Sequence, residues 1–343
     1  MHISAIFLYL LASGFIASAI GTFFYLRLAR RHAFFAIPNA RSSHHSKTTH
    51  GGGIVFAAVF LAGQVILFLL GLEPSNVFVA MAGGGALITV IGFMDDMFEV
   101  SARLRFSVHI GLSILILVCF GGFPPLPAGE LVVNLGWAGH ILAALGLIWL
   151  INLYNFVDGV DGMAASGAIF SGLAAAVVVT IGTGSVTEAV IPAFLAATVA
   201  GFLLFNWPPA ALFMGDSGST FLGYIFGAFL VMTVANETMS LWNWVIILGC
   251  FIADTGTTLA LRIWMIKKWY QVAHRSHAYQ NLARVWKSHK MVTGGVVLIN
   301  IFWLLPMALL SMHYPDVAPF IAVIALLPLI GISLKYGPLY SSA

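Results

Sequence analysis

The sequence predicts an all-α, polytopic integral membrane protein. Of its 343 residues, 60% are hydrophobic and 8% are charged, and the mean hydropathy is +0.99. Apolar runs of about 18–24 residues recur from end to end, which is the length that an α-helix needs to cross a bilayer. This composition excludes a soluble fold. The runs predict about eleven transmembrane helices, over residues 3–25, 52–71, 77–94, 106–121, 134–154, 163–182, 188–205, 219–235, 241–263, 292–311 and 317–335.

Loop charges predict the orientation of these helices. If the eleven spans alternate, one side receives all 15 Lys and Arg residues, whereas the loops of the other side carry only acids, such as Glu130 and Glu237. Cytoplasmic loops carry the excess of basic residues in membrane proteins, so we expect the N-terminus outside and the C-terminus in the cytoplasm. The first apolar run has no basic segment before it and is longer than the core of a signal peptide, so we expect it to be retained.

Nothing in the sequence divides the chain. It has no internal repeat, low-complexity tract or linker, and no loop is long enough to fold separately. Cys119 and Cys250 both lie inside apolar runs, where packing explains them better than a disulfide or a metal site. We therefore expect a single domain over residues 1–343.

The first inner loop ends in three glycines, Gly51, Gly52 and Gly53, which open the second apolar run. Glycine lets the backbone approach a ligand closely, and the N–H groups at a helix start attract anions. Basic residues before the glycines would add positive charge, so this loop is a candidate phosphate-binding segment. The simpler alternative is an ordinary basic loop at the cytoplasmic surface.

The second inner loop pairs two adjacent acids, Asp95 and Asp96, with Arg103 and Arg105. Adjacent carboxylates need a counter-charge or a cation to stay ionised together, and Mg²⁺ held by carboxylates and substrate phosphates is the usual solution in phosphoryl chemistry. The alternative is a solvated helix end at which acids and arginines pair.

The third polar element repeats at helical spacing. Asn152, Asn155, Asp158 and Asp161 follow one another at intervals of three residues, which predicts one polar face until the glycines that follow loosen the backbone. Such a row could hold a nucleotide or a phosphate-bound metal, and a structural polar network between helices is the alternative.

Two further loops carry candidate site residues. Asp216 stands between Gly215 and Gly218 at the start of an apolar run, where its carboxylate could approach a metal closely. The last inner loop supplies His274, Arg275 and His277, which are suitable groups for binding a diphosphate. His289 lies on the same inner segment outside this cluster, so we expect it to have no role in the site.

Across these loops the chain resembles the polyprenyl-phosphate N-acetylhexosamine-1-phosphate transferase superfamily, glycosyltransferase family 4. The resemblance covers nearly the whole chain, and its most specific parts are the Asn-x-x-Asn-x-x-Asp-Gly-x-Asp-Gly string from Asn152 and the Met-Gly-Asp-x-Gly-Ser string from Met214. It implies Mg²⁺-dependent transfer, with Mn²⁺ as an alternative, of a sugar 1-phosphate from a UDP-N-acetyl sugar to undecaprenyl phosphate, and UMP leaves. It further implies the inner membrane of a bacterium, a periplasmic N-terminus and an active site that faces the cytoplasm.

The resemblance also implies roles for the candidate residues. Asp216 becomes the Mg²⁺ ligand, and Asp95, supported by Asp96, activates or positions the acceptor phosphate. His274, Arg275 and His277 are predicted catalytic residues that face the phosphates. The predicted substrate-binding residues are Asn152, Asn155, Asp158, Asp161, Gly51, Gly52 and Gly53, together with Arg103 and Arg105 from the second loop. Besides substrates and the bilayer, a second copy of the chain is a candidate partner, and nucleic acid is not expected.

Two departures from the family pattern bear on the substrate. His50 stands where a basic residue usually precedes the glycines, which puts the contact of the first loop with substrate in doubt. The last loop reads His-Arg-Ser-His-Ala-Tyr-Gln from His274. It resembles the O-antigen-initiating branch, which accepts UDP-N-acetylfucosamine or UDP-N-acetylquinovosamine, more than the peptidoglycan enzyme, phospho-N-acetylmuramoyl-pentapeptide transferase.

Three alternatives stay open at this point. The peptidoglycan enzyme shares the fold and the chemistry. A transporter or channel would suit the intramembrane Asp254 and the helix broken near Pro208 and Pro209, but it predicts acids near the bilayer midplane and repeated halves. A scaffold subunit without chemistry would be expected to lack at least one acidic motif, and all of them are present.

Overall fold

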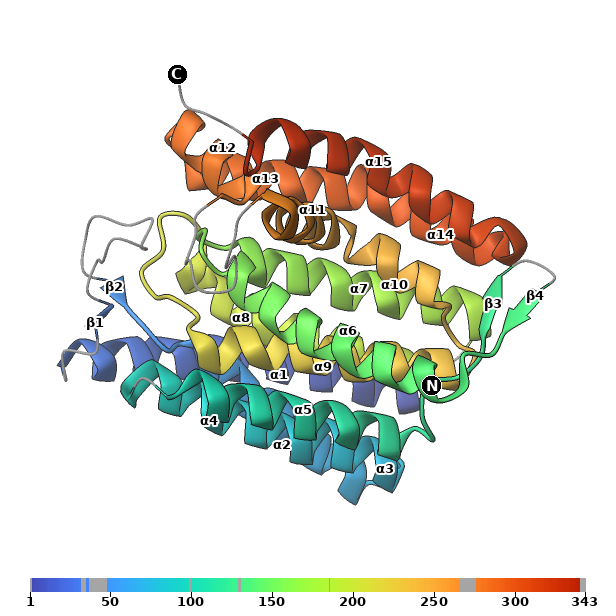
Figure 1. Cartoon of the computed structure of the whole chain (residues 1–343). Helices are drawn as coiled ribbons and strands as arrows, with labels where there is room; N and C mark the ends of the chain where they lie inside the picture. The colour runs from blue at the N-terminus through green and yellow to red at the C-terminus, as the bar shows by residue number, and fades with distance from the viewer. Residues whose placement is uncertain are drawn as a thin grey trace.

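The computed structural model describes residues 2–31, 35–36, 48–98, 100–128, 131–184, 186–265 and 276–339. Within these ranges the chain forms a bundle of long helices (Figure 1), so the all-α prediction is confirmed. His274 and Arg275 lie outside the described residues. The helices of the first half are α1 (His2–Arg31), α2 (Gly53–Leu69), α3 (Ser75–Phe78), the π-helix η1 (Val79–Gly84), α4 (Gly85–Phe98), α5 (Ala102–Cys119), α6 (Gly136–Val157) and α7 (Met163–Thr183).

The second half continues in the same way. Its helices are α8 (Val186–Asn206), α9 (Asp216–Ala235), α10 (Leu241–Ile247), α11 (Gly249–Met265), α12 (Ala278–Trp286), α13 (His289–Ile299), the π-helix η2 (Asn300–Leu304), α14 (Leu305–His313), the 3₁₀-helix η3 (Pro315–Val317) and α15 (Ala318–Tyr336). Two short antiparallel hairpins lie at opposite ends of the bundle: β1 (Phe35–Ala36) pairs with β2 (Thr48–Thr49), and β3 (Leu126–Ala128) pairs with β4 (Leu131–Val133) (Figure 1).

Each of the eleven apolar runs coincides with a helix, but two of them are not simple spans. Among the described residues, nine helical segments are long and apolar enough to cross a membrane, or ten if one bent pair counts as a span. That pair is α10 and α11, which meet at 84° around Leu248, and α11 is seen nearly end-on in Figure 1. The second run forms only the 17-residue α2. The number of crossings and the orientation therefore stay predictions.

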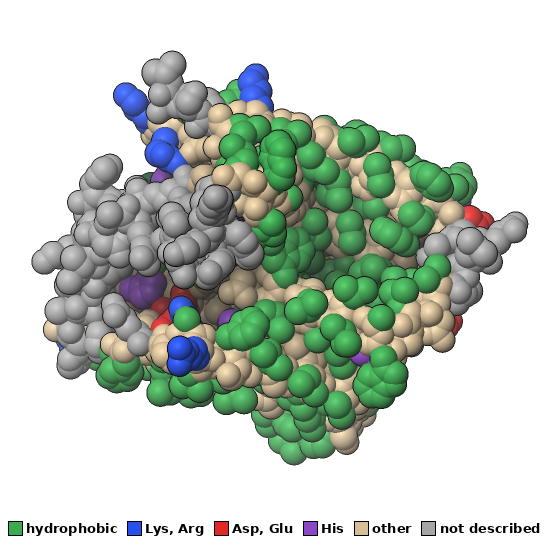
Figure 2. All heavy atoms as spheres, viewed as in Figure 1, with side chains coloured by type: hydrophobic (Ala, Val, Ile, Leu, Met, Phe, Trp, Pro, Cys, Tyr) green, Lys and Arg blue, Asp and Glu red, His purple; other side chains and the backbone are tan. Residues whose placement is uncertain are grey.

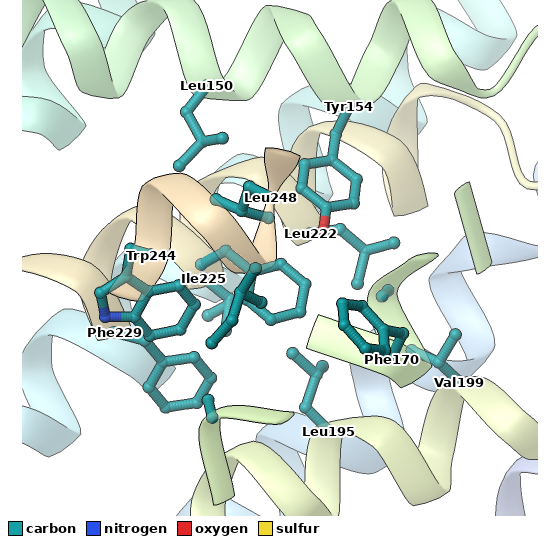
Figure 3. Packing of buried hydrophobic residues seen from close by; sticks show 14 of the residues in the cluster. Leu150, Tyr154, Phe170, Leu195, Val199, Leu222, Ile225, Phe229, Trp244 and Leu248 are labelled. Carbon is teal, nitrogen blue, oxygen red and sulfur yellow. The ribbon is translucent and has the colours of Figure 1, made fainter. Parts of the chain in front are cut away.

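Helix α9 lies at the centre of the bundle and packs against α2, α4 and α6. Of the candidate membrane spans, α9 has the largest share of buried residues, 89% of its apolar segment. The aromatic ring of Tyr154 on α6 stacks on Phe226 of α9 with ring centres 5.4 Å apart. Figure 3 shows Leu222, Ile225 and Phe229 of α9 surrounded by side chains from neighbouring helices. This packing fixes the position of the first residues of α9, which carry Asp216.

The outer surface is apolar, as expected for helices that face lipid. Hydrophobic side chains are spread over the described part of the face in Figure 2, whereas Lys and Arg side chains gather at the end of the bundle that carries β2 and α12. The exposed residues include Leu8, Tyr9, Phe24, Trp137 and Phe302. This distribution agrees with a membrane protein whose basic residues lie on one side of the bilayer.

The starts of α2 and α9 touch through glycine. A Cβ added to Gly53 would lie 2.3 Å from the Cα of Gly218, which is shorter than any allowed contact. The backbone N–H groups of Gly52 and Gly53 donate to the carbonyls of Phe213 and Met214, at 2.9 and 2.8 Å. The glycines therefore hold the 213–218 segment against α2.

We expect Gly53→Ala to destabilise the protein, because the atoms that its methyl group would meet are backbone atoms and cannot move aside. Overpacking of this kind costs about 2 kcal/mol, which would appear as a lower unfolding temperature in detergent. Gly294→Ala is the matched control, since a Cβ there meets no atom within 4 Å. Equal unfolding temperatures for the two variants would contradict the close approach.

Candidate active site

Asp96 holds the N-terminus of α9. Its two carboxylate oxygens accept hydrogen bonds from the backbone N–H groups of Asp216, at 2.7 Å, and Ser217, at 3.1 Å. Nε2 of His50 lies 2.9 Å from the same carboxylate, whose side chain is only 3% exposed. A carboxylate is stabilised at a helix N-terminus because it satisfies N–H groups that have no partner within the helix. Asp96 thus acts on the site through α9 and does not face the cleft.

Asp95 contacts the start of α5. One of its oxygens accepts from the backbone N–H of Val100, at 2.7 Å, and the other pairs with the guanidinium of Arg105. Nη1 of Arg105 also lies 3.5 Å from Oδ2 of Asp216. Arg105 is therefore placed between a carboxylate of α4 and a carboxylate of α9. Ser101 caps the start of α5 by accepting from the N–H of Leu104, which fixes the helix that carries this arginine.

Asp216 is the most accessible of these carboxylates. Its side chain is 27% exposed, against 9% for Asp95 and 3% for Asp96. Asn155 of α6 donates from Nδ2 to Oδ1 of Asp216, at 2.7 Å, and to the hydroxyl of Ser219, at 3.2 Å. One carboxylate oxygen is thus held by an amide, while the other faces Arg105 and the cleft.

The cleft lies between α5, α6 and α9 and has a volume of about 490 Å³. Its polar lining consists of Arg103, Arg105, His109, Asn152, Asn155, Asp216 and Thr220, and Phe106 and Phe156 form apolar walls. In Figure 2, acidic and basic side chains meet in a hollow near the basic end of the bundle. Of the residues predicted from the second, third and fourth loops, the cleft brings together Arg103, Arg105, Asn152, Asn155 and Asp216.

The polar row from Asn152 to Asp161 is not continuous, contrary to the expectation from spacing. Helix α6 ends at Val157, so only Asn152 and Asn155 share its face, and Nδ2 of Asn152 donates to the carbonyl of Ile148 at 2.7 Å. Asp158 follows the helix and accepts from the N–H of Gly215, at 3.3 Å. The row breaks because the turn after Val157 redirects the chain.

Asp161 faces away from the cleft. It is 8% exposed, its Oδ2 accepts from the N–H of Ala210 at 3.1 Å, and its carbonyl accepts from the hydroxyl of Thr293 at 2.7 Å. Nδ1 of His289 lies 3.4 Å from the same carboxylate. The structure thus places Asp161 outside the cleft, with His289 as its neighbour, and the roles predicted for the two residues in the reaction stay predictions.

The three glycines also differ from the expected anion-binding loop. Gly51, Gly52 and Gly53 are buried, and the N–H groups of the last two already donate to backbone carbonyls. The N–H groups of Gly52 and Gly53 are therefore not free to bind a phosphate. Their function in the structure is close packing of α2 against α9.

His277 is buried in the structure, at 3% exposure, and its Nδ1 lies 2.7 Å from Oδ2 of Asp254. The other oxygen of Asp254 accepts from the N–H of Ala278, at 2.7 Å, at the start of α12. The ring also stacks on Tyr279, whose hydroxyl donates to the carbonyl of Phe156, at 2.6 Å. His277 thus connects α12 to α11 and to the end of α6. Direct contact with a phosphate, as expected from the sequence, is not what this geometry favours.

Sequence reasoning missed two histidines of the site. His109 is 6% exposed and lines the cleft one helical turn beyond Arg105, a spacing that could have indicated it. His50 was noted only as a departure from the family pattern, whereas the structure places it on Asp96. Burial alone would lower the pKa of His50, but the hydrogen bond with Asp96 and the negative charges of Asp96, Asp158 and Asp216 raise it above its ordinary value.

The residues of the cleft suit a magnesium ion that is shared with a substrate. The described residues contain no group of three or more His, Cys, Asp or Glu side chains that could hold a metal by themselves. Mg²⁺ commonly binds through one or two carboxylates together with substrate phosphates. The partly exposed Asp216, held in place by Asn155, fits this kind of site.

Comparison with known proteins identifies the family. Residues 78–234 match the family described as glycosyl transferase family 4. A probable undecaprenyl-phosphate N-acetylglucosaminyl 1-phosphate transferase of Bacillus subtilis is 30% identical over 269 residues, which are 77% of this chain and 73% of the relative. The chain belongs to glycosyl transferase family 4. The resemblance noted in the sequence is thereby confirmed.

Other relatives in the family differ in acceptor and sugar. A decaprenyl-phosphate N-acetylglucosaminephosphotransferase of Mycobacterium leprae is 34% identical over 218 residues, 59% of this chain, and the chain spans about half, 54%, of that relative. A phospho-N-acetylmuramoyl-pentapeptide-transferase of Halalkalibacterium halodurans is 29% identical over 234 residues, which are 62% of this chain and 68% of the relative.

The raised pKa of Asp158 predicts that the stability of the protein depends on pH. Burial raises the pKa of Asp158 well above its ordinary value, and the charges of Asp216 and Asp96 add to the rise, whereas His50 and the N–H of Gly215 oppose it. The folded protein then binds this proton more tightly than the unfolded chain does. Stability should therefore fall as the pH rises from the ordinary carboxyl range toward the raised pKa, by at most about 1.4 kcal/mol per pH unit.

Asp158→Asn should remove this part of the pH dependence, since the amide stays neutral. The measurement is the unfolding temperature in detergent from about pH 5 to about pH 8. Asp316→Asn, at an exposed position, serves as the control. The same slope in wild type and in Asp158→Asn would contradict the assignment.

His277→Ala should lower stability, because Asp254 would remain buried with one partner fewer. Leaving a buried carboxylate oxygen without its hydrogen-bond partner costs about 3 kcal/mol. His277→Asn is the matched variant: its amide nitrogen takes the place of Nδ1, so we expect it to keep most of the stability. A His277→Ala protein that unfolds at the wild-type temperature would contradict this structural role. It would favour the contact between His277 and the substrate phosphates that the sequence predicts.

Proposed function

We propose that this protein transfers an N-acetylhexosamine 1-phosphate from a UDP-sugar to undecaprenyl phosphate and releases UMP. The observation that carries the proposal is the placement of Asp216, which is partly exposed in a cleft between helices beside Arg105 and Asn155. The activities named for the relatives from Bacillus subtilis and Mycobacterium leprae support the same reaction class.

The reaction requires that an oxygen of the acceptor phosphate attacks the β-phosphorus of the UDP-sugar. A new phosphorus–oxygen bond forms, the bond to the oxygen shared with the α-phosphorus breaks, and UMP leaves with that oxygen. Mg²⁺ bound at Asp216 would neutralise the diphosphate during this exchange. Asn155 keeps the Asp216 carboxylate oriented, and Arg105 and Arg103 supply positive charge at the cleft for the phosphates.

The acceptor carries a long apolar chain, and the structure offers a surface for it. An apolar cavity of about 290 Å³ lies among α6, α9, α10 and α11, with Leu147, Leu150, Trp244 and Leu248 among its lining residues. Figure 2 shows a hollow lined by hydrophobic side chains on the face that also carries the polar hollow. Helices α6 and α9 border both, so a lipid with a phosphate head could occupy the two together.

For the biological product we propose a lipid-linked surface polysaccharide of the O-antigen type in a bacterial inner membrane, with the site facing the cytoplasm. The order of residues in the loop from His274 supports this branch. The relatives named for N-acetylglucosamine make that sugar the first donor to test, ahead of N-acetylfucosamine and N-acetylquinovosamine. Peptidoglycan precursor transfer is the second candidate, favoured by the relative from Halalkalibacterium halodurans.

The contacts of Asp254 weigh against the transporter alternative. Asp254, the acid expected to suit a translocation pathway, is 5% exposed and is held by His277 and by the N–H of Ala278. A carboxylate fixed in this way stabilises the start of α12.

The decisive assay uses the purified full chain in detergent with undecaprenyl phosphate, Mg²⁺ and a panel of UDP-N-acetyl sugars. Mass spectrometry of the extracted lipids should detect a polyprenyl diphosphate sugar, and UMP should appear in equal amount. Formation of UMP without a lipid product, or no product from any donor, would contradict the proposed transfer.

Asp216→Asn should reduce turnover by about 10³-fold or more, because an amide keeps the shape of the carboxylate but loses the charge that a hard cation requires. The unfolding temperature should stay close to that of the wild type, which shows that the loss is catalytic. Near wild-type turnover in Asp216→Asn at ordinary Mg²⁺ concentrations would exclude this residue as the metal ligand.

A further inference from the structure

We propose that His50 is a positioning residue, which orients Asp216 through Asp96 and the first turn of α9. The inference rests on the proposed transfer reaction only for its activity measurements. Two contacts in series support it: Nε2 of His50 contacts the Asp96 carboxylate, and this carboxylate accepts hydrogen bonds from the N–H groups of Asp216 and Ser217. Asn155 then holds the Asp216 side chain from α6.

The backbone at His50 is held by α1. Its backbone carbonyl accepts a hydrogen bond from the hydroxyl of Tyr25 on α1, at 2.9 Å. Gly51, which follows, has a positive φ of 78°, and a Cβ there would lie 2.7 Å from the same hydroxyl. The chain is thereby held so that the imidazole lies against Asp96.

Only one nitrogen of the ring carries this contact. Nδ1 is buried and has no hydrogen-bond partner among the described residues, whereas Nε2 lies 2.9 Å from Oδ1 of Asp96. None of the polar groups that line the cleft belongs to His50. Its effect on the reaction therefore passes through Asp96 and not through contact with substrate.

Asp96 needs this partner because it is almost completely buried. Gly215 closes over it: a Cβ at Gly215 would lie 2.6 Å from Oδ2 of Asp96. A buried carboxylate keeps its orientation only when its oxygens are bonded on several sides. Without the His50 contact, Oδ1 would keep only the N–H of Asp216, and the carboxylate could rotate and take the start of α9 with it.

Amide substitutions test this geometry atom by atom. In His50→Gln the amide nitrogen takes the place of Nε2, so the bond to Asp96 can form. In His50→Asn the amide nitrogen takes the place of Nδ1 and does not reach Asp96, and His50→Ala removes the donor altogether. His313→Ala, at an exposed histidine of α14, is the control for loss of a histidine.

The first measurement is independent of activity. Hydrogen exchange of peptides that contain residues 214–219 should be faster in His50→Ala and His50→Asn than in the wild type, and close to wild type in His50→Gln and His313→Ala. Peptides from α15 should be unchanged in all four variants. Unchanged exchange over 214–219 in His50→Ala would overturn the proposal even if the transfer reaction were confirmed.

The second measurement is product formation. We expect kcat to fall about 10–100-fold in His50→Ala and His50→Asn, since displacement of a reacting group by about 1 Å can cost 10²-fold. KM for the UDP-sugar should change little, and His50→Gln should restore most of kcat. Equal losses in the Gln, Asn and Ala variants, or a loss expressed mainly in KM, would contradict positioning through Asp96. Absence of product in the wild type would contradict the proposed function and leave the exchange result to decide the role of His50.

Discussion

The site depends on a single capping interaction, the carboxylate of Asp96 at the N-terminus of α9. The N–H groups at a helix start have no partner within the helix, and they carry partial positive charge. Asp96 satisfies two of them and is itself too buried to interact with solvent. Because α9 packs against α2, α4 and α6, this contact determines where the first turn of α9 lies, and Asp216 is the first residue of that turn.

The carboxylates of the motifs therefore have different partners and different structural roles. Carboxylates close together repel one another unless each has a partner. Asp95 has Arg105, Asp96 has His50 and the α9 backbone, and Asp158 has the N–H of Gly215. Asp216 keeps an oxygen directed to the cleft, since Asn155 engages the other. In the fold, Asp216 is the carboxylate that lines the cleft, and the less exposed Asp95 and Asp96 hold the groups around it.

The sequence predicts long-range features well where one physical requirement dominates. Apolar runs of membrane length became helices, and the polar interruptions marked the cleft. The break at Leu248 was not predicted, because residues 241–263 contain no proline and an isolated glycine such as Gly249 is tolerated inside many helices. Spacing also failed at Asp161, since helical periodicity holds only while the helix continues, and α6 ends at Val157. The glycines before α2 were predicted to bind a phosphate, because a run of glycines in the sequence indicates close approach of the backbone equally well to a phosphate or to another helix.

The placement of the cleft beside an apolar cavity constrains the ligand more than either feature alone. In a bilayer, charged groups are stabilised only where they pair, bind a cation or reach water. Arg105 and Asp216 lie at the ends of their helices, where a polar ligand can reach them, while the cavity among α6, α9, α10 and α11 is lined mainly by apolar side chains. A water-soluble nucleotide sugar could use only the first region, and an uncharged lipid only the second. A ligand that uses both must have a charged head and an apolar tail, which is why a polyprenyl phosphate suits this arrangement of helices better than a transported ion does.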